Sequence, residues 1–366
     1  MRIAIINSAD GWKLGWATSP HTLQPVIYSL IRAEITVDVY NVDDLESLSQ
    51  AVLDIKKNQA IAWVNAYQVN VVKTNNDEKV WLSDILEQHQ VPYIGSNSQA
   101  LQNVLAKHQC QHILTTNKVS IPYFTKVDAD NINILKQLIM LNNLEFPLFV
   151  KPDALSSSMG ISQDCIVYDI EQLKKQIQIL SNEFGYPLMV EEYLPGDDIT
   201  VAVINSGDEH ILLPTYYRAD NHETEFTVLD RQDRLQNWGG SKQMHVVTEP
   251  DILAQIPKVV LPACKALGIS DVTRIDCRID RHGKLKAFDV NGLPGLEYPD
   301  SVTVWQFITK FKNLTWIEGF DILINLIVYS AAKRNQMPIP PKVDRIATQY
   351  MKELQVIPQQ QAELSV

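Results

Sequence analysis

Short apolar runs alternate with helical patterns through the first 95 residues, and this alternation constrains the fold more than any other feature. The apolar runs lie at Ile3–Ile6, Thr36–Tyr40, Ala60–Val64 and Val91–Ile94. Apolar residues recur at helical spacing between them, over Thr22–Glu34, Leu45–Lys57 and Lys79–His89. The alternation predicts an α/β chain that begins with an open parallel sheet, with helices on both faces.

The loop after the first strand is expected to line a site, because ligands of open parallel sheets bind at the carboxyl ends of the strands. This loop, Asn7–Ser19, reads NSADGWKLGWATS, which is poor in glycine and does not resemble a phosphate loop. Trp12, Lys13 and Trp16 are typical of walls around an organic substrate. Aromatic side chains that only cap the sheet edge explain the pattern equally well.

Composition and charge exclude several classes of partner. A chain of 366 residues with 45% hydrophobic content can bury cores for two or three domains. The net charge of −11 and the lack of a long Lys/Arg run argue against nucleic acid and against anionic membrane surfaces. The four cysteines are widely spaced and form no C-x-x-C pair, which favours neither a disulfide framework nor a zinc site. We therefore expect a reducing, cytoplasmic location.

Neither end of the sequence has the pattern of a membrane segment. Only four apolar residues follow Met1-Arg2, which is too short for the apolar core of a secretion signal. Gly319–Ala332 is more apolar, but Asp321 and Asn325 interrupt it and its length is insufficient to cross a bilayer. We expect a buried amphipathic helix there, and no membrane partner.

A two-stranded pattern occupies Arg274–Gly295, which reads RIDCRIDRHGKLKAFDVNGLPG. Arg274–Asp280 alternates in strand fashion, Arg281–Gly283 supplies a turn, and Lys286–Asn291 is a second short strand. The sequence therefore predicts a β-hairpin that is closed by Gly-Leu-Pro-Gly.

The hairpin places polar side chains of one chemical kind together. Asp289 and Asn291 are two residues apart on a strand, so they point to the same side, and Asp276 on the partner strand can approach them. Carboxylate and amide oxygens are the ligands that Mg²⁺ prefers, especially where substrate phosphates complete the shell. A surface hairpin with acids on its solvated face fits the spacing equally well.

The order R-x-D, a dozen residues, acid-x-Asn and L-P-G resembles the last motif of the D-alanine–D-alanine ligases, which are ATP-grasp carboxylate–amine ligases. Further motifs stand upstream in the family order, such as P-Y-I-G at 92–95 and V-K-P…S-S-M-G at 150–160, so the resemblance covers roughly residues 90 to 310. It implies an ATP-grasp fold behind the N-terminal open parallel α/β domain. The expected parts are an N-terminal substrate domain (1–98), a central subdomain (99–186), a C-terminal subdomain with the metal site (187–335) and a tail (336–366).

The resemblance also implies a nucleotide site. It places Lys107, within a predicted helix Ala100–Thr116, on the α- and β-phosphates of ATP, and Lys151 on a phosphate and the adenine edge. The small-residue turn after Lys151 would hold the terminal phosphates through Ser157 and Ser158. The other implied nucleotide contacts are Ile161, Glu191, Tyr193, Leu194, Asp198 and Phe288. From the residues alone, a solvated helix lysine and a flexible polar hairpin remain alternatives.

Metal, catalytic and substrate roles follow from the same resemblance. Asp276, Asp289 and Asn291 would hold Mg²⁺, with two ions expected and Mn²⁺ as a substitute. Arg274 and the Gly295 N–H would stabilise the tetrahedral oxyanion. The remaining implied contact is Ser301, whose hydroxyl would hold the carboxylate of the amine substrate, with Asp300 and Tyr298 as alternatives. Trp12 and Lys13, which the resemblance does not place, are expected from the loop sequence itself to line the site of the other substrate.

The sequence departs from the family at several places, including Ser156 in place of a glycine and Asp198 where the family has a glutamate, and three further departures concern the substrate loop, the metal site and the lid. Asn7–Ser19 lacks the family glutamate that holds an ammonium group, and Asp289 stands where the family has a glutamate. The polar stretch Tyr216–Glu249, expected to be an irregular lid, lacks the family Lys-Tyr pair and offers Arg231, Arg234 and Lys242 instead.

These departures favour an ATP-dependent, ADP-forming ligase that couples an amino-acid amine to a small carboxylate other than D-alanine. A natural-product ligase of the mycosporine type is one example. A D-alanine–D-alanine ligase of cell-wall synthesis and a nucleotide-binding ATP-grasp protein without turnover are the alternatives. The expected partners are ATP and small amino-acid or carboxylate substrates, and a homodimer is left open.

Overall fold

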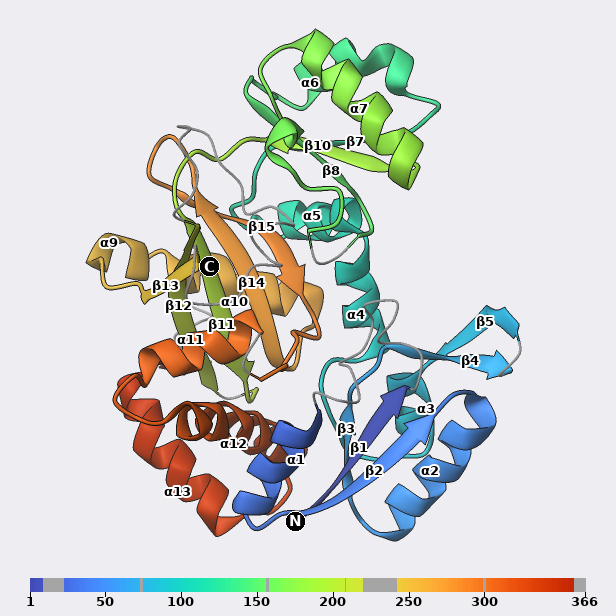
Figure 1. Cartoon of the computed structure of the whole chain (residues 1–366), viewed down its shortest axis with the longest axis vertical. Coiled ribbons are helices and arrows are strands. Elements are labelled where there is room, and N and C mark those ends of the chain that lie inside the picture. The colour runs from blue at the N-terminus through green and yellow to red at the C-terminus, as the bar shows by residue number, and fades with distance from the viewer. Residues whose placement is uncertain are drawn as a thin grey trace.

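The computed structural model describes residues 1–8, 23–72, 75–155, 158–207, 209–219, 242–298 and 301–358. The described residues form three parts, which Figure 1 shows as separate groups of strands and helices. We refer to them as the N-terminal domain (1–95), the central lobe (120–192) and the C-terminal lobe (98–119 and 193–358). The predicted α/β class with an N-terminal parallel sheet is confirmed.

The N-terminal sheet has the strand order β2-β1-β3-β6, and every neighbouring pair is parallel. Its strands are β1 (Arg2–Ser8), β2 (Thr36–Val42), β3 (Ile61–Val64) and β6 (Tyr93–Ile94). The helices are α1 (Leu23–Arg32), α2 (Leu45–Lys57) and α3 (Leu82–Gln88). One face of the sheet packs on α2 and α3 through residues such as Ile6 and Leu48, and the other packs on α1 through Ile5 and Leu30.

A hairpin that the periodicity did not predict follows β3. It consists of β4 (Gln68–Val72) and β5 (Asn75–Trp81), which pair antiparallel. The predicted helix from Lys79 therefore begins only at Leu82. The reason is that the ladder to β4 takes up the backbone of residues 79–81, and Trp81 is still extended (φ −77°, ψ 132°) where it precedes the helix.

The central lobe is an antiparallel sheet with the order β7-β10-β8-β9. Its elements are β7 (Phe124–Val127), α6 (Leu135–Leu141), β8 (Leu148–Pro152), β9 (Ile166–Val167), α7 (Ile170–Phe184) and β10 (Leu188–Glu192). The sequence placed residues 187 onward in the C-terminal part, but β10 pairs with both β7 and β8. Leu188 and Val190 are fully buried in the central core, which holds this strand in place.

The C-terminal lobe is built on the sheet β13-β12-β11-β14-β15. Its strands are β11 (Asp198–Asn205), β12 (Glu209–Ala219), β13 (Lys242–Val246), β14 (Asp271–Ile279) and β15 (Leu285–Asn291). The helices beyond them are α9 (Pro250–Leu253), α10 (Ile256–Leu267), α11 (Val302–Lys310) and α12 (Trp316–Arg334). Helices cover both faces of this sheet, as alternate residues of β11 show. Val201 and Val203 pack on α10, while Ala202 and Ile204 pack with α11 and α12. Within the predicted irregular stretch Tyr216–Glu249, the residues up to Ala219 belong to β12 and Lys242–Val246 form β13.

The predicted single helix Ala100–Thr116 is two helices, α4 (Ser98–Leu105) and α5 (Lys107–Thr116). The backbone is extended at Ala106 (φ −97°, ψ 114°). Asp153 causes the break, because its carbonyl accepts the Lys107 N–H (3.1 Å) and its carboxylate accepts the His108 N–H (2.7 Å). Lys107 thereby becomes the first residue of a new helix. Both helices pack into the C-terminal core, although the sequence placed them in the central part.

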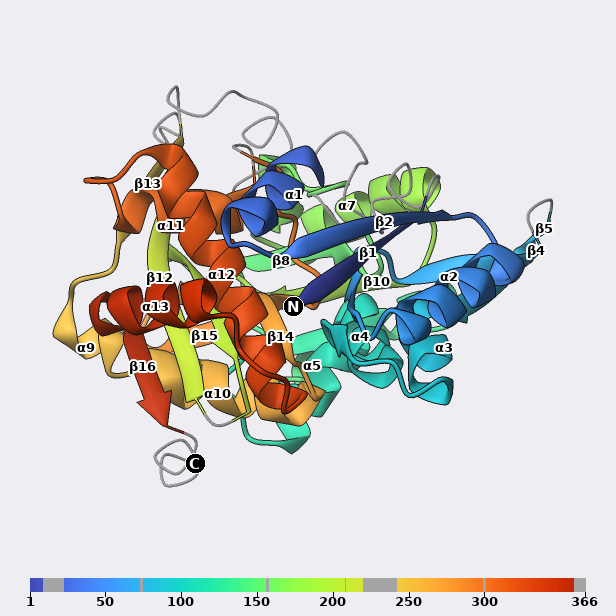
Figure 2. The ribbon, with the colours of Figure 1, turned by 90° about the horizontal axis from the view of Figure 1, so that it is seen from below.

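The predicted tail 336–366 contains ordered structure within its described residues. These residues form α13 (Pro341–Tyr350) and β16 (Gln355–Pro358), which Figure 2 shows in succession. Val343 and Ala347, one helical turn apart, are fully buried against the C-terminal core. β16 pairs with β12. The helix α12 occupies the expected place of Gly319–Ala332, and no helix among the described residues is long and apolar enough to cross a membrane.

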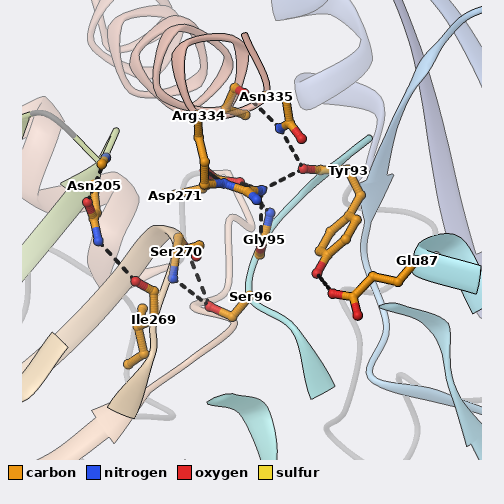
Figure 3. A network of polar contacts seen from close by, with 12 residues as sticks. Glu87, Tyr93, Gly95, Ser96, Asn205, Ile269, Ser270, Asp271, Arg334 and Asn335 are labelled. Carbon is orange, nitrogen blue, oxygen red and sulfur yellow. Dashed lines mark hydrogen bonds and ion pairs between the residues drawn. The ribbon is translucent and has the colours of Figure 1, made fainter. Parts of the chain in front are cut away.

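A buried ionic network joins the N-terminal domain to the C-terminal lobe (Figure 3). Arg334 at the end of α12 donates from Nε and Nη2 to the two carboxylate oxygens of Asp271, each at 2.8 Å. Asp271 also accepts the Gly95 N–H (2.7 Å), and Arg334 donates to the Tyr93 carbonyl (2.7 Å). The carboxylate of Asp271 is fully buried. The network therefore fixes the end of the parallel sheet against β14.

Candidate active site

A β-bulge in the β14–β15 hairpin sets the face on which the polar side chains lie. Asp276 pairs with Asp289, but the register shifts between Asp276 and Cys277, which leaves Phe288 as the extra residue of β15. In a regular ladder Asp276 would face Phe288, and Asp289 and Asn291 would turn to the opposite, core side. The bulge therefore brings Asp289 and Asn291 to the face of Asp276.

A cavity of about 220 Å³ is lined by residues of the central and C-terminal lobes. The predicted site residues that line it are Lys107, Lys151, Ser158, Ile161, Glu191, Tyr193, Leu194, Asp198, Arg274, Asp276, Phe288, Asp289 and Asn291. These residues come from segments up to 184 positions apart (107 to 291), and the fold gathers them around one space. Ser157, Trp12 and Lys13 lie outside the described residues, as do Trp16, Arg231 and Arg234.

One end of the cavity carries a partly buried ion pair. Lys107 Nζ lies 2.6 Å from Asp289 Oδ1. Burial acts to raise the pKa of Asp289, but the charges of Lys107, Lys151 and Arg274 outweigh it and lower this pKa to about 2. Burial likewise acts to lower the pKa of Lys107, and the Asp289 carboxylate reverses the effect and raises it. Both side chains are therefore charged at neutral pH.

Asp276 is held by three neighbours. Its carboxylate accepts hydrogen bonds from Arg274 Nε and Nη2, both at 2.9 Å, and from Thr200 Oγ1 at 2.7 Å. Asn291 Nδ2 approaches it at 3.4 Å. Thr200 was not predicted as a site residue, because only the pairing of β11 with β14 places it opposite Asp276.

These side chains fit a divalent metal ion that shares its shell with phosphates. Two carboxylates and an amide oxygen on one face are the hard ligands that Mg²⁺ takes. Among the described residues, no group of three His, Cys, Asp or Glu side chains could hold a metal. Asp276, Asp289 and Asn291 would therefore supply only part of a coordination shell, and the substrate would provide the remaining oxygens.

A second ion pair lies close to the first and leaves a buried acceptor atom at the cavity. Lys151 Nζ donates to Glu191 Oε1 (2.7 Å) and to the Phe288 carbonyl (3.4 Å), and both charged side chains are 5% exposed. Glu191 Oε2 is buried and has no hydrogen-bond partner among the residues that the structure describes. Burial raises the pKa of Glu191, and the charge of Lys151 opposes this shift. A buried polar atom without a partner costs free energy, so this position fits the polar edge of a ligand such as an adenine.

Arg278 is a lining residue that the sequence analysis did not assign. It lies 3.3 Å from Asp198, donates to the Gly196 carbonyl (2.9 Å) and lies over the ring of Tyr193 at 5.2 Å. The strand alternation already placed Arg278 on the face of Asp276, and this was the available signal. It connects the turn between the lobes to β14.

Gly295 and Ser301 lie near one another but are absent from the described lining of the cavity. The Ser301 hydroxyl donates to the Gly295 carbonyl and accepts the Val304 N–H (3.5 Å) at the start of α11. Ser301 thus has a structural role as a helix cap. Its predicted contact with a substrate carboxylate remains a prediction.

Comparison with known proteins identifies the family. The family model described as "D-ala D-ala ligase C-terminus" matches residues 114–305. The D-alanine–D-alanine ligase of Pelagibacter ubique is 25% identical over 255 residues, which cover 68% of this chain and 76% of that protein. An uncharacterized protein y4sG of Sinorhizobium fredii is 24% identical over 216 residues, covering 58% of this chain and 60% of that protein.

Solved structures share the fold. The D-alanine–D-alanine ligase of Bacillus anthracis complexed with ATP has a TM-score of 0.64 at 18% identity, covering 92% of this chain and 99% of that chain. VanG D-Ala:D-Ser ligase of Enterococcus faecalis has a TM-score of 0.58 at 18% identity, covering 89% and 99%. Because the family match spans more than half of the 366 residues, the chain belongs to the D-alanine–D-alanine ligase family of ATP-grasp enzymes and is an ATP-dependent ligase that joins a carboxylate to an amine.

Proposed function

We propose that this ligase activates a small carboxylate other than D-alanine with ATP and couples it to the amine of an amino acid. The observation that carries the chemistry is the charged end of the cavity, where Lys107, Asp289, Asp276 and Arg274 lie together. A nucleotide-binding protein without turnover would not require this set. The set therefore favours an enzyme over a binding protein.

A carboxylate is a poor electrophile, so the reaction is expected to occur in two steps. The terminal phosphoryl group of ATP passes to a carboxylate oxygen, and ADP leaves. The amine then attacks the carbonyl carbon, phosphate leaves with the C–O bond electrons, and the nitrogen loses a proton. Catalysis of phosphoryl transfer consists mostly of positioning and charge neutralisation, and Lys107 and Lys151 supply the cationic charge.

Asp276, Asp289 and Asn291 are the residues that would hold Mg²⁺, and we propose two ions, with Mn²⁺ as a substitute. When bound, the metal ions neutralise charge on the phosphate oxygens. Asp289 is one methylene shorter than the family glutamate, and the bulge at Phe288 is what turns it toward Asp276. Lys107 holds the Asp289 carboxylate in its ionised form, which a metal ligand requires.

Arg274 and the Gly295 N–H are proposed to stabilise the tetrahedral oxyanion of the second step. Arg274 is 9% exposed and its guanidinium is fixed by two hydrogen bonds to Asp276. A donor that is held in position before the reaction costs no reorganisation, and removing one such donor typically lowers the rate by about 10²–10³-fold.

The choice of a carboxylate other than D-alanine rests on the sequence of Asn7–Ser19. Trp12 and Lys13 stand in a loop where the family has a glutamate for an ammonium group. Indole walls suit a flatter or more apolar substrate than alanine, and a lysine suits a carboxylate. D-alanine–D-alanine ligase activity is the second candidate, because the relatives from Pelagibacter ubique and Bacillus anthracis carry that name. A natural-product role, a cytoplasmic location and a homodimer remain predictions.

Phosphate release from ATP tests the proposal. The purified protein is assayed with D-alanine alone and with a panel of small carboxylates, each with and without amino acids. We expect little release with D-alanine alone and release with a different carboxylate and an amino acid together. Efficient conversion of D-alanine to its dipeptide would instead support a D-alanine–D-alanine ligase of cell-wall synthesis. If no phosphate is released under any condition, a nucleotide-binding protein without turnover is favoured.

A further inference from the structure

Tyr67 is the one described residue of the N-terminal domain that lines the cavity. It lies three residues beyond β3, at the carboxyl end of the parallel sheet, where ligands of such sheets are found. The other described lining residues come from the central and C-terminal lobes. The N-terminal domain is expected to hold the carboxylate substrate. Among the described residues, it contacts the cavity through Tyr67.

The local structure holds Tyr67 in this position. Its ring meets the ring of Trp81 edge to face, with centroids 6.4 Å apart and an interplanar angle of 89°. Its carbonyl accepts the Leu82 N–H at 3.1 Å. Both partners lie where the β4–β5 hairpin ends and α3 begins. The unpredicted hairpin thus fixes both the backbone and the ring of Tyr67.

The hydroxyl of Tyr67 lies at the charged end of the cavity. Tyr67 lines the cavity together with Asp289, Asn291 and Gly292. The backbone of Leu293, in the turn that follows Asn291, acts to lower the pKa of Tyr67 and the charge of Asp289 acts to raise it, so both groups lie close to the hydroxyl. A phenol oxygen that accepts an N–H bond keeps its own proton for a second partner. The neighbours on this side include the cations Lys107 and Arg274, which have no acceptor atoms in their charged groups, and the Asp289 carboxylate, which already accepts from Lys107 at 2.6 Å.

We propose that the Tyr67 hydroxyl donates a hydrogen bond to the terminal phosphate of the bound nucleotide. The proposal rests on the proposed function, because it takes the charged end of the cavity as the place of the phosphates. A neutral hydroxyl adds a directed donor beside the lysines without adding charge. It also joins the N-terminal domain to the phosphoryl group that its substrate is to receive. Tyr67 is thus assigned as a phosphate-contacting residue that distinguishes a triphosphate from a diphosphate.

The test compares two nucleotides in Tyr67→Phe, which removes the hydroxyl and keeps the ring. Dissociation constants for ADP and for the non-hydrolysable analogue AMP-PNP are measured by titration with Mg²⁺. We expect AMP-PNP to bind roughly tenfold more weakly than to the wild type, since a hydrogen bond to a charged group is lost, and ADP binding to change little. Tyr40→Phe is the matched control, because its hydroxyl meets Asn58 in the same domain, outside the described lining of the cavity.

Each outcome is decisive. If Tyr67→Phe weakens the binding of both nucleotides equally, or of neither, the proposal for Tyr67 is wrong. Neither result would contradict the proposed nucleotide site. Failure of wild-type protein to bind ADP or AMP-PNP would instead refute the proposed function. Should Tyr67→Phe fail to fold, Tyr67→Met removes the same hydroxyl, and the same ratio of the two dissociation constants decides.

Discussion

At the scale of single residues, the Lys107–Asp289 ion pair connects the proposed phosphate site with the proposed metal site. The two side chains come from α5 and β15, and their charged atoms are 2.6 Å apart. The pair keeps Asp289 ionised despite its burial. Replacing either residue by an apolar one would leave the charge of the other partly buried and without this partner.

Replacing the proposed metal ligands should abolish turnover without unfolding the chain. Asp289→Ala is expected to lower Mg²⁺-dependent ATP turnover by about 10²-fold or more, because a metal at a transferring phosphate stabilises the transition state by several kcal/mol. Asp276→Ala and Asn291→Ala should behave alike. Asp289→Glu is the control, because it keeps the carboxylate. Near wild-type rates and unchanged Mg²⁺ dependence in Asp289→Ala and Asn291→Ala would contradict the assignment.

At the scale of elements, two aspartates organise segments that carry the site. Asp153 begins α5 and thereby positions Lys107. Its carboxylate also meets His108 Nδ1 at 2.7 Å. Asp280 organises the turn between β14 and β15, where its Oδ1 accepts the N–H groups of His282 (2.8 Å) and Lys284 (2.9 Å).

Asp153 should influence nucleotide binding although it does not contact the cavity. Asp153→Ala removes the cap of α5, which is expected to cost about 1 kcal/mol of stability. We also expect ADP to bind several-fold more weakly, because Lys107 loses its fixed place at the start of the helix. Asp153→Asn keeps an acceptor for the His108 N–H and should stay near the wild type. ADP titration of both variants measures this, and unchanged affinity in Asp153→Ala would exclude a positioning role.

The turn at Asp280 predicts a pH dependence. Burial acts to raise the pKa of Asp280, but the Lys284 and His282 N–H groups and the charge of Lys286 lower it below 3.8. A lowered folded-state pKa means that the stabilisation is present above pH 3.8 and is lost as pH falls below it. The difference in Tm between the wild type and Asp280→Ala should therefore shrink below about pH 4. A difference that stays constant from pH 6 to pH 3 would show that the ionised carboxylate is not responsible.

At the scale of the whole molecule, the Arg334–Asp271 network holds the N-terminal domain on the C-terminal lobe (Figure 3). Asp271 is fully buried, whereas Arg334 is 26% exposed. Burial raises the pKa of Asp271, and the bonds from Arg334 oppose this shift. The position of Tyr67 over the cavity depends on this docking, because Tyr67 belongs to the N-terminal domain.

Removal of Arg334 should destabilise the chain strongly. Arg334→Ala leaves the buried Asp271 carboxylate without its cation, which is expected to cost about 3–5 kcal/mol. Arg32→Ala is the matched control, because its pair with Asp321 is at the surface and should contribute less than about 1 kcal/mol. Urea unfolding of the three proteins measures the difference. Similar losses in both variants would show that the network contributes no more than a surface pair.

Local patterns in the sequence determined the parallel N-terminal sheet, the hairpin Arg274–Gly295 and the buried helix at 319–332. Such patterns suffice because helix and strand periodicities depend on residues that are close in the sequence. The motif order also predicted a set of side chains for one site, and most of them line one cavity in the structure.

Only the tertiary structure decided the features that depend on contacts between segments far apart in the sequence. Asp153 divides the helix near Lys107 from 46 residues away, and β10 joins the central sheet because β7 and β8 pair with it. The bulge at Phe288 turns Asp289 toward Asp276, and docking of the N-terminal domain brings Tyr67 to the cavity. Each of these features depends on hydrogen bonds or packing between residues far apart in the chain, which no local pattern records.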